Sequence, residues 1–272
     1  MRVYLSGGNP THDMVLEAFA EGAGATLVSG WKWAPDDIAV VFGIRKERVP
    51  ASYPRGEIIK KQERHGGRVI VLETGYVNRG SGRDHHYAAG WGGLNGRADF
   101  RNAGMAADRW ELLGRGLRPW RGDGARIVVC GQVPWDAACQ DHHHLGWCQL
   151  VTAKLGRRFG PAVAFRPHPL AAGVNYGVRC EISARTLDED LADAKVVVTW
   201  NSNTAVDAVI AGVPVIAMDP GSMAWAVAGH TLDDVENPPK PDREKWTWAL
   251  AHCQWLPAEM SAGLAWRHLS RP

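Results

Sequence analysis

The sequence lacks several features that mark particular classes of protein. No apolar run approaches membrane-spanning length, and the opening "MRVYLSGGNPTHD" reaches Gly-Gly-Asn-Pro too early for the core of a signal peptide. The charges nearly cancel, with 31 Lys and Arg against 29 Asp and Glu, so the composition is unlike that of a dedicated nucleic-acid-binding domain. We therefore expect a soluble, cytoplasmic protein, in which a local basic groove is still compatible with the composition.

Cysteine and glycine motifs are also missing. The five cysteines are scattered and form no Cys-x-x-Cys pair, which argues against a zinc or redox motif and favours free thiols in a reducing compartment. Neither G-x-G-x-x-G nor a P-loop lysine occurs, which argues against a dinucleotide or ATP site. Tryptophan, by contrast, is abundant: the 13 residues either pack within and between domains or include a few that line a groove for bases or sugars.

Short apolar runs rich in Val and Ile recur along the chain, each followed by Gly or polar residues and then by a helical pattern. This order is typical of βα units with a buried parallel sheet. The runs are "RVYLSG", "ATLVSG", "IAVVFG" and "RVIVLE" in the first half, and "RIVVCG", "AVAFRP", "KVVVTW" and "PVIAMD" in the second. The pattern predicts an α/β protein with two Rossmann-like parallel-sheet domains that face a cleft.

The Gly-rich and charged stretch at residues 114–126 is the best linker between the two sets of runs. We expect an N-terminal acceptor-binding domain over residues 1–118 and a nucleotide-sugar-binding domain over residues 119–238. Residues 239–272 are expected to add helices at 242–253 and 257–269 that pack across the domains. Residues 75–101 form a long Gly-rich and Arg-rich region with little periodicity, which favours a functional loop.

Three polar turns follow predicted strands of the second half, at the edge where open α/β sheets bind ligands. After "VVVT", Asn201, Ser202, Asn203 and Thr204 supply more donors than a helix cap requires, although capping alone also explains part of the run. "RPHP" holds Arg166 and His168 between prolines, as suits a diphosphate. "CGQVP" offers Gly131 for close backbone approach and Gln132 as a neutral hydrogen-bonding group.

At these turns the sequence resembles the GT-B glycosyltransferases and, within them, the C-terminal domain of the capsule-polysaccharide and Kdo-transferase type. "RPHP" and "NSNTAVDAVIAGVPVIA" carry the resemblance, which covers residues 126–219. It implies that the nucleotide diphosphate of a sugar donor contacts Arg166, His168, Ser202, Asn203 and Thr204. Asp207 replaces the usual Glu of this pattern, so it either meets the ribose or faces solvent. A UDP-sugar is the expected donor, with no tightly bound metal, since Arg166 and His168 can neutralise a leaving diphosphate.

The first half is then expected to hold the acceptor and the catalytic base. Glu73 ends the run "RVIVLE", where removal from water would make it a stronger base for a hydroxyl, although a buried pair with Arg79 is the alternative. Asp84, His85 and Asp99 are further candidates for the base. Metal binding competes as an interpretation of "DHH" at 84–86 and of "CQDHHHLGWC" at 139–148, but neither run has the i, i+4 spacing of a helical metal site.

Small transferases rich in Trp and Arg resemble bacteriophage enzymes that glycosylate hydroxymethylated pyrimidines in DNA. This resemblance implies a 5-hydroxymethylcytosine acceptor in double-stranded DNA, in the cytoplasm of a bacterial host, with the base swung out of the stack. The residues best placed to hold DNA are Arg79, Arg83, Trp91, Arg97 and Arg101. Two alternatives stay open: an enzyme like the sugar-nucleotide epimerases, which share a related arrangement, and a non-catalytic module that binds nucleotides or nucleic acid.

Overall fold

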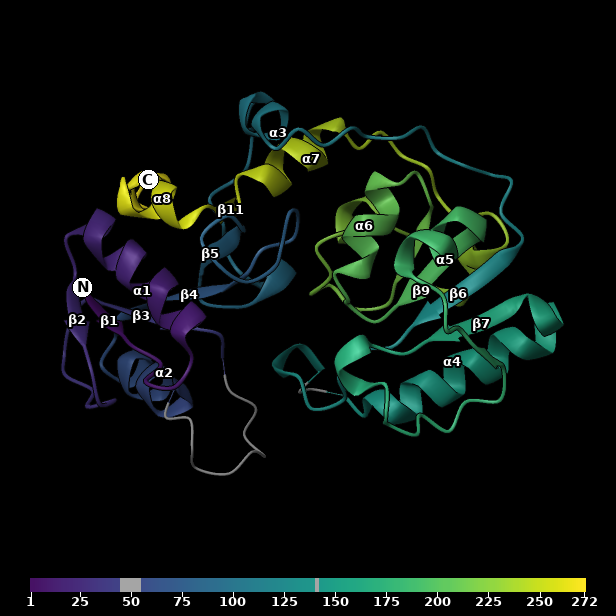
Figure 1. Ribbon diagram of the computed structural model, residues 1–272, viewed down its shortest axis with the longest axis horizontal. Coiled ribbons are helices and arrows are strands. Elements are labelled where there is room, and N and C mark those ends of the chain that lie inside the picture. The colour runs from purple at the N-terminus through teal and green to yellow at the C-terminus, as the bar shows by residue number, and fades with distance from the viewer. Residues whose placement is uncertain (45–54, 140–141) are drawn as a thin grey trace. The chain divides into compact units, whose positions relative to one another are not determined.

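The computed structural model describes residues 1–44, 55–139 and 142–272. The chain divides into two compact units, each built around one β-sheet (Figure 1). Unit 1 comprises Met1–Gly114 together with Glu244–Pro272, and unit 2 comprises Arg115–Arg243. The boundary after Gly114 lies at the start of the stretch that the sequence suggests as a linker. Within the described residues, the structure contains no helix with the length and apolarity needed to span a membrane.

The unit 1 sheet has the strand order β11-β5-β4-β3-β1-β2. Four of its strands are the four predicted runs, and they are parallel: β1 (Arg2–Tyr4), β2 (Thr26–Val28), β3 (Ile38–Phe42) and β4 (Arg68–Thr74). The other two, β5 (Tyr87–Trp91) and β11 (Gln254–Trp255), are antiparallel additions that the sequence analysis missed. The predicted parallel strands thus form most of the unit 1 sheet, and antiparallel pairs with β5 and β11 extend it at one edge.

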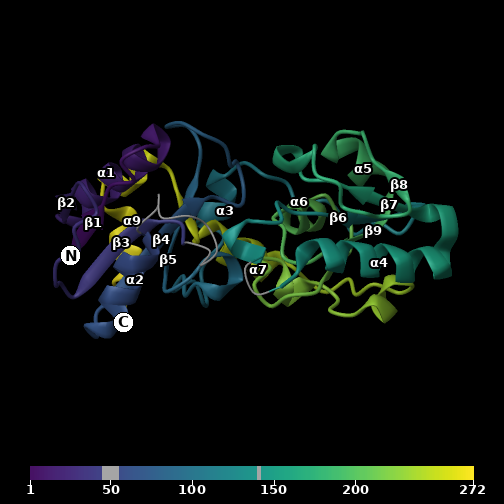
Figure 2. The ribbon, with the colours of Figure 1, turned by 90° about the horizontal axis from the view of Figure 1, so that it is seen from below.

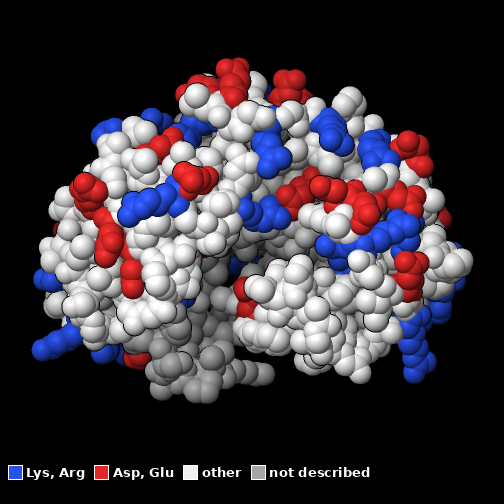
Figure 3. All heavy atoms as spheres, in the orientation of Figure 1, with Lys and Arg blue, Asp and Glu red and all other residues white. Residues whose placement is uncertain are grey.

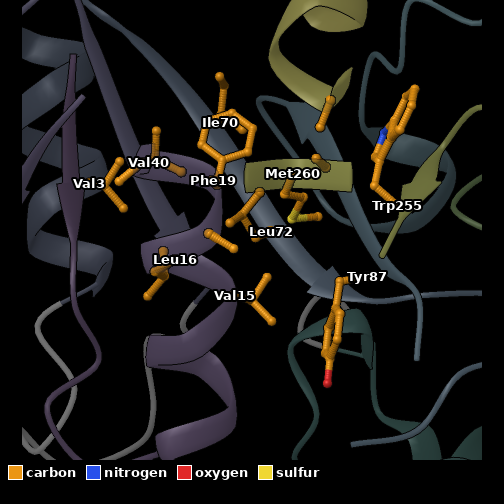
Figure 4. Close-up of a cluster of buried hydrophobic side chains, with 14 of the residues drawn as sticks. Val3, Val15, Leu16, Phe19, Val40, Ile70, Leu72, Tyr87, Trp255 and Met260 are labelled. Atoms are coloured by element: carbon orange, nitrogen blue, oxygen red, sulfur yellow. The ribbon is translucent and has the colours of Figure 1, made fainter. Parts of the chain in front are cut away.

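Helix α1 (Pro10–Ala23) follows β1 because the local sequence defines both of its ends. The Asn9 side chain accepts from the backbone N–H groups of Thr11 and His12, Pro10 occupies the first turn, and Gly24 ends the helix with φ of 60°. Val15, Leu16 and Phe19 on its inner face pack with strand residues such as Val40 and Leu72 in the core of unit 1 (Figure 4).

The C-terminal residues complete unit 1. They form α7 (Glu244–Ala251), β11, α8 (Pro257–Ser261) and α9 (Leu264–Leu269), so that one expected helix ends earlier and the other is divided at Gly263. Helix α8 approaches α1 so closely that a Cβ atom on Gly22 would lie 1.9 Å from the Met260 carbonyl oxygen. The remaining helices of the unit are α2 (Arg55–Arg64), α3 (Asp108–Leu112) and the short 3-10 helix η1 (Asn95–Arg97).

The unit 2 sheet is entirely parallel, with the order β10-β9-β6-β7-β8. Its strands are β6 (Arg126–Cys130), β7 (Val163–Arg166), β8 (Glu181–Ile182), β9 (Ala194–Thr199) and β10 (Val215–Ala217). Helix α4 (His144–Phe159) covers one face, whereas α5 (Leu187–Asp193) and α6 (Thr204–Ile210) cover the other (Figures 1 and 2). Short 3-10 helices lie between these elements, and they are η2 (Ala137–Cys139), η3 (Gly160–Ala162), η4 (Pro169–Ala171), η5 (Trp225–Val227) and η6 (Leu232–Val235).

Candidate functional site

The three polar turns of unit 2 begin side by side. Strand β6 lies between β7 and β9, and Cys130 at its end is in register with Arg166 on one side and with Thr199 on the other. Because the strands are parallel, the residues after all three positions leave the sheet at the same edge. We call this edge, with the turns at 131–139, 166–171 and 199–204, the carboxyl edge of unit 2.

Gln132 and Asn201 join the first and third turns. The Gln132 Nε2 donates to Asn201 Oδ1 at 2.7 Å, and the Asn201 backbone N–H donates to Gln132 Oε1 at 3.1 Å. Both side chains are buried. The backbone around Gln132 is also held, because its N–H donates to His144 Nε2 and its carbonyl accepts from the Tyr176 hydroxyl. These two residues therefore fix the relative position of the turns, and their polar atoms are engaged with one another.

Ser202 and Thr204 organise the start of α6. The Ser202 hydroxyl accepts from the Thr204 backbone N–H and donates to Thr204 Oγ1 at 3.1 Å. Since Thr204 Oγ1 is the acceptor in that bond, its own hydrogen is available to a different acceptor. Asn203 occupies the cap position without a side-chain capping bond, and its Oδ1 is buried without a hydrogen-bond partner. Helix capping alone therefore explains Ser202 better than it explains Asn203.

Arg166 and His168 are held by different partners. Arg166 Nη1 donates to the carboxylate of Asp190 at 2.8 Å and to the Arg185 carbonyl at 2.7 Å. The His168 Nδ1 accepts from the Leu170 backbone N–H, so in the neutral ring the proton lies on Nε2. This tautomer makes Nε2 a hydrogen-bond donor of the kind that a phosphate oxygen accepts.

The structure shows the surroundings of Gly131 and Asp207, which the sequence alone does not predict. A Cβ atom on Gly131 would lie 2.6 Å from the Phe165 ring, so this glycine makes room for a core side chain. Asp207 lies half-buried in α6, one turn after Thr204.

Asp219, which the sequence analysis did not single out, also belongs to the carboxyl edge. It follows β10, is almost fully buried, and accepts from Asn201 Nδ2 at 2.6 Å and from the Gly221 backbone N–H at 3.0 Å. The carbonyl of Ala138 accepts from the same Asn201 nitrogen. An acidic residue at the end of the apolar run "PVIAMD" was the available signal, because it places a fourth polar turn at this edge.

Cys139, His142 and His144 form a group whose potential ligand atoms all lie within 4.8 Å of one another. Their hydrogen bonds do not fit a metal site well. His144 Nδ1 lies 3.1 Å from His142 Nε2, and its Nε2 accepts the backbone N–H of Gln132. A histidine that binds a metal through one nitrogen normally donates the proton of its other nitrogen to an oxygen. In His144, by contrast, one nitrogen accepts a backbone N–H and the other faces a histidine nitrogen. We therefore interpret the group as a hydrogen-bonded anchor of the turn at 131–139.

The candidates for a catalytic base lie in unit 1. Glu73 stands near the end of β4, half-buried, where its Oε1 accepts from the Tyr76 hydroxyl and from the Asn95 backbone N–H, each at 2.7 Å. Burial and the charge of Glu73 raise the pKa of Tyr76 well above its ordinary value, so the tyrosine stays a neutral donor. Asp84 is exposed, and His85 is half-buried with Gly80 packed against its ring.

Asp99 is separated from Glu73 by the antiparallel course of β5. Glu73 is in register with Ala88, whereas Asp99 pairs through its backbone with Trp91, which is in register with Ile70. At about 3.3 Å per residue, these positions differ by about 10 Å along the strands. The structure thus brings Asp84 and His85, which precede β5, toward the end of β4 and leaves Asp99 toward its beginning.

The residues proposed for DNA binding are scattered within unit 1. Arg83 and Arg97 are exposed, Arg79 donates to the Tyr76 carbonyl, and Arg101 pairs with Asp99. Trp91 lies in the core and donates to the Leu269 carbonyl, so its ring has no open face for a base and we remove it from the candidates. On the face shown in Figure 3, basic and acidic side chains of the described residues are interspersed and form no continuous basic surface.

No protein-family model matches the chain, and no curated protein matches its sequence. The solved structures that are similar in fold include two Kdo transferases. One is the beta Kdo 2,7 transferase of Thermosulfurimonas dismutans KpsC, with 15% identity and a TM-score of 0.59 over 100% of both chains. The other is the beta Kdo 2,4 transferase of the same KpsC, with 11% identity and a TM-score of 0.62 over 91% of this chain and 89% of the other. The expected two-domain Rossmann-like fold, and its resemblance to that of Kdo transferases, are confirmed.

Proposed function

We propose that this protein is a glycosyltransferase that binds a nucleotide-sugar donor at the carboxyl edge of unit 2 and transfers the sugar to a hydroxyl group. The main support is the convergence at this edge of Ser202, Thr204 and His168, on a fold shared with two Kdo transferases. Hydrogen-bond donors held in fixed positions stabilise the charge that develops on a leaving phosphate.

The donor contacts differ in what each residue supplies. Thr204 offers its hydroxyl group, the Ser202 hydroxyl holds that group in place, and His168 offers the Nε2 proton. Arg166 contributes positive charge while Asp190 holds its guanidinium in place. Gln132 and Asn201 are positioning residues in this proposal, because their amides are bonded to each other. A UDP-sugar remains our first choice of donor, and none of these steps calls for a metal ion.

The acceptor and the base are assigned to unit 1. In this proposal the Glu73 carboxylate removes the proton from the acceptor hydroxyl, with Asp84 and His85 as the next candidates. The finer hypothesis, a 5-hydroxymethylcytosine acceptor in DNA, now depends on Arg83 and Arg97 as exposed contacts with the phosphates.

The first test is transfer from a defined donor. The protein is incubated with UDP-, CMP- and GDP-sugars, including a nucleotide-activated Kdo because the two similar structures are Kdo transferases. Release of the nucleotide and the mass of the products are followed. We expect release with at least one donor, and release that Ser202→Ala with Thr204→Val reduces. Interconversion of the donor sugar without transfer would indicate the epimerase alternative, and nucleotide binding without turnover would indicate the non-catalytic module.

The DNA hypothesis is tested separately. The same donors are combined with hydroxymethylated and with unmodified DNA, and the nucleosides are weighed after digestion. A mass increase on hydroxymethylated nucleosides alone is the expected result. If nucleosides keep their mass with every donor, DNA is not the acceptor, and the proposed donor site is unaffected.

A further inference from the structure

Tryptophan residues are numerous in this chain, and one of them differs from the rest in its surroundings. All 13 lie within the described residues, and Trp135 alone exposes more than half of its side chain, at 56%. The other 12 are buried or half-buried, as in the contacts of Trp91 and Trp255 with the unit 1 core. Packing therefore explains most of the tryptophan content, but it does not explain Trp135.

Trp135 lies in the middle turn of the carboxyl edge of unit 2. Its turn follows β6, the strand between β7 and β9, so this turn begins between the turn that carries His168 and the turn that carries Ser202. A ligand whose phosphates reach both outer turns would cross the start of this turn. An indole exposed at this place offers a flat apolar face that a bound ligand can cover.

The backbone of this turn is well defined. The Asp136 N–H donates to the Val133 carbonyl at 3.0 Å, with Pro134 and Trp135 as the two central residues of a β-turn. Asp136 Oδ1 accepts from the Ala138 N–H, and the Gln132 N–H donates to His144. The indole is therefore presented by a turn that is anchored on both sides, which lowers the entropy lost when a ligand packs on it.

We propose that Trp135 is the stacking surface for the nucleobase of the donor. This inference rests on the proposed function, since it assigns one more contact of the same ligand. A planar base is favoured as the occupant because an exposed indole offers a flat face, and neighbouring turns supply donors suited to the phosphates. Stacking requires no base-specific hydrogen bond, so Trp135 contributes affinity for nucleotides in general rather than selection of one base.

The test compares nucleotide and pyrophosphate binding by calorimetry. UDP, CDP, GDP, CMP and inorganic pyrophosphate are titrated into the wild type, Trp135→Ala, Trp135→Phe and the control Leu150→Ala. Leu150 lies on α4 and is 54% exposed, so it matches the loss of an exposed apolar side chain. For Trp135→Ala we expect about tenfold weaker binding of the best nucleotide with unchanged pyrophosphate binding. Trp135→Phe keeps most of the affinity, and Leu150→Ala matches the wild type.

The outcomes separate this inference from the proposed function. Wild-type binding of a nucleotide that Trp135→Ala leaves unchanged overturns the role of Trp135 alone. Equal weakening of nucleotide and pyrophosphate binding also overturns it, because the substitution would then act on the turn as a whole. If the wild type binds none of the nucleotides, the proposed donor site fails as well. An unchanged melting temperature for Trp135→Ala confirms that each comparison concerns folded protein.

Discussion

The two units differ in where their sheet topology places the polar residues that follow the strands. In unit 2 every strand is parallel, so the turns after β6, β7, β9 and β10 meet at one edge and bond to one another. In unit 1, β5 runs against β4 and β11, its neighbours in the sheet, so Glu73 and Asp99 are separated along the sheet. Polar residues at strand ends thus define a joint site only where the strands are known to be parallel.

The largest expected effect concerns the base in unit 1. Glu73→Gln keeps the acceptor oxygen for Tyr76 and Asn95 but cannot take a proton, so transfer should slow by about 10²- to 10⁴-fold. Nucleotide affinity should stay unchanged, because the proposed donor contacts lie in unit 2. Rates and affinities are measured with the best donor, and Asp99→Asn is the control. A rate for Glu73→Gln within threefold of the wild type would assign the base to another residue.

The next effect concerns the ion pair beneath the carboxyl edge of unit 2. Asp190 is 0% exposed and Arg166 is 15% exposed, so Asp190→Ala leaves a largely buried guanidinium without its carboxylate. We expect unfolding free energy to fall by about 3 kcal/mol. The matched control is Asp193→Ala, which breaks the Arg185–Asp193 pair, with side chains 43% and 44% exposed, and costs about 0.5 kcal/mol or less. Urea unfolding measures both. Equal losses of unfolding free energy in the two variants would mean that burial of the Arg166–Asp190 pair adds nothing to stability.

Acid should weaken unit 1 through two histidines. Burial lowers the pKa of His268 to about 4; burial and then the charge of Arg55 do the same for His12. Between about pH 6.5 and pH 4 the unfolded chain binds more protons than the folded one, so stability falls as the pH falls. Amide-exchange protection in α9 should therefore decrease over this window. His268→Gln, which retains a donor for the Phe100 carbonyl, should show a smaller decrease. An equal decrease in both proteins would exclude His268 as a cause.

The smallest expected effect tests a single hydroxyl at the carboxyl edge of unit 2. Ser202→Ala removes one hydrogen-bonding group beside Thr204 and should weaken binding of the best nucleotide about threefold to tenfold. Ser81→Ala, at an exposed position in unit 1, serves as the control and should bind as the wild type does. Calorimetric titration checks both variants. Identical affinities in the two variants would remove Ser202 from the proposed contacts.

Much of the candidate site in unit 2 follows from local sequence. Runs such as "KVVVTW" predict buried parallel strands, and the polar residues after them then fall at one edge. The partners of those residues could not be predicted. The link between Gln132 and Asn201, the ion pair of Arg166 with Asp190, and the burial of Asp219 all depend on contacts between separate strands and helices.

In unit 1, less of the structure follows from local sequence than in unit 2. Strand β5 has the sequence YAAGW, with three small residues between two aromatic ones inside the Gly-rich region, so its hydrophobic pattern is too weak to predict a strand. Strand β11 has only two residues. Strand β5 forms because it pairs with β4 on one side and with β11 on the other, and β11 forms because it pairs with β5. The same pairing buries Trp91, which the sequence had suggested as a contact for DNA.

The sequence by itself determined the βα order, the two-domain Rossmann-like class and the polar turns that follow the strands, because hydrophobic periodicity and turn residues act over short distances. Only the tertiary structure decided the antiparallel strands of unit 1, the separation of Glu73 from Asp99, and the exposure of Trp135 among 12 more deeply packed tryptophans. These features depend on pairing and packing between residues that are distant in the chain, for which no local pattern carries the information.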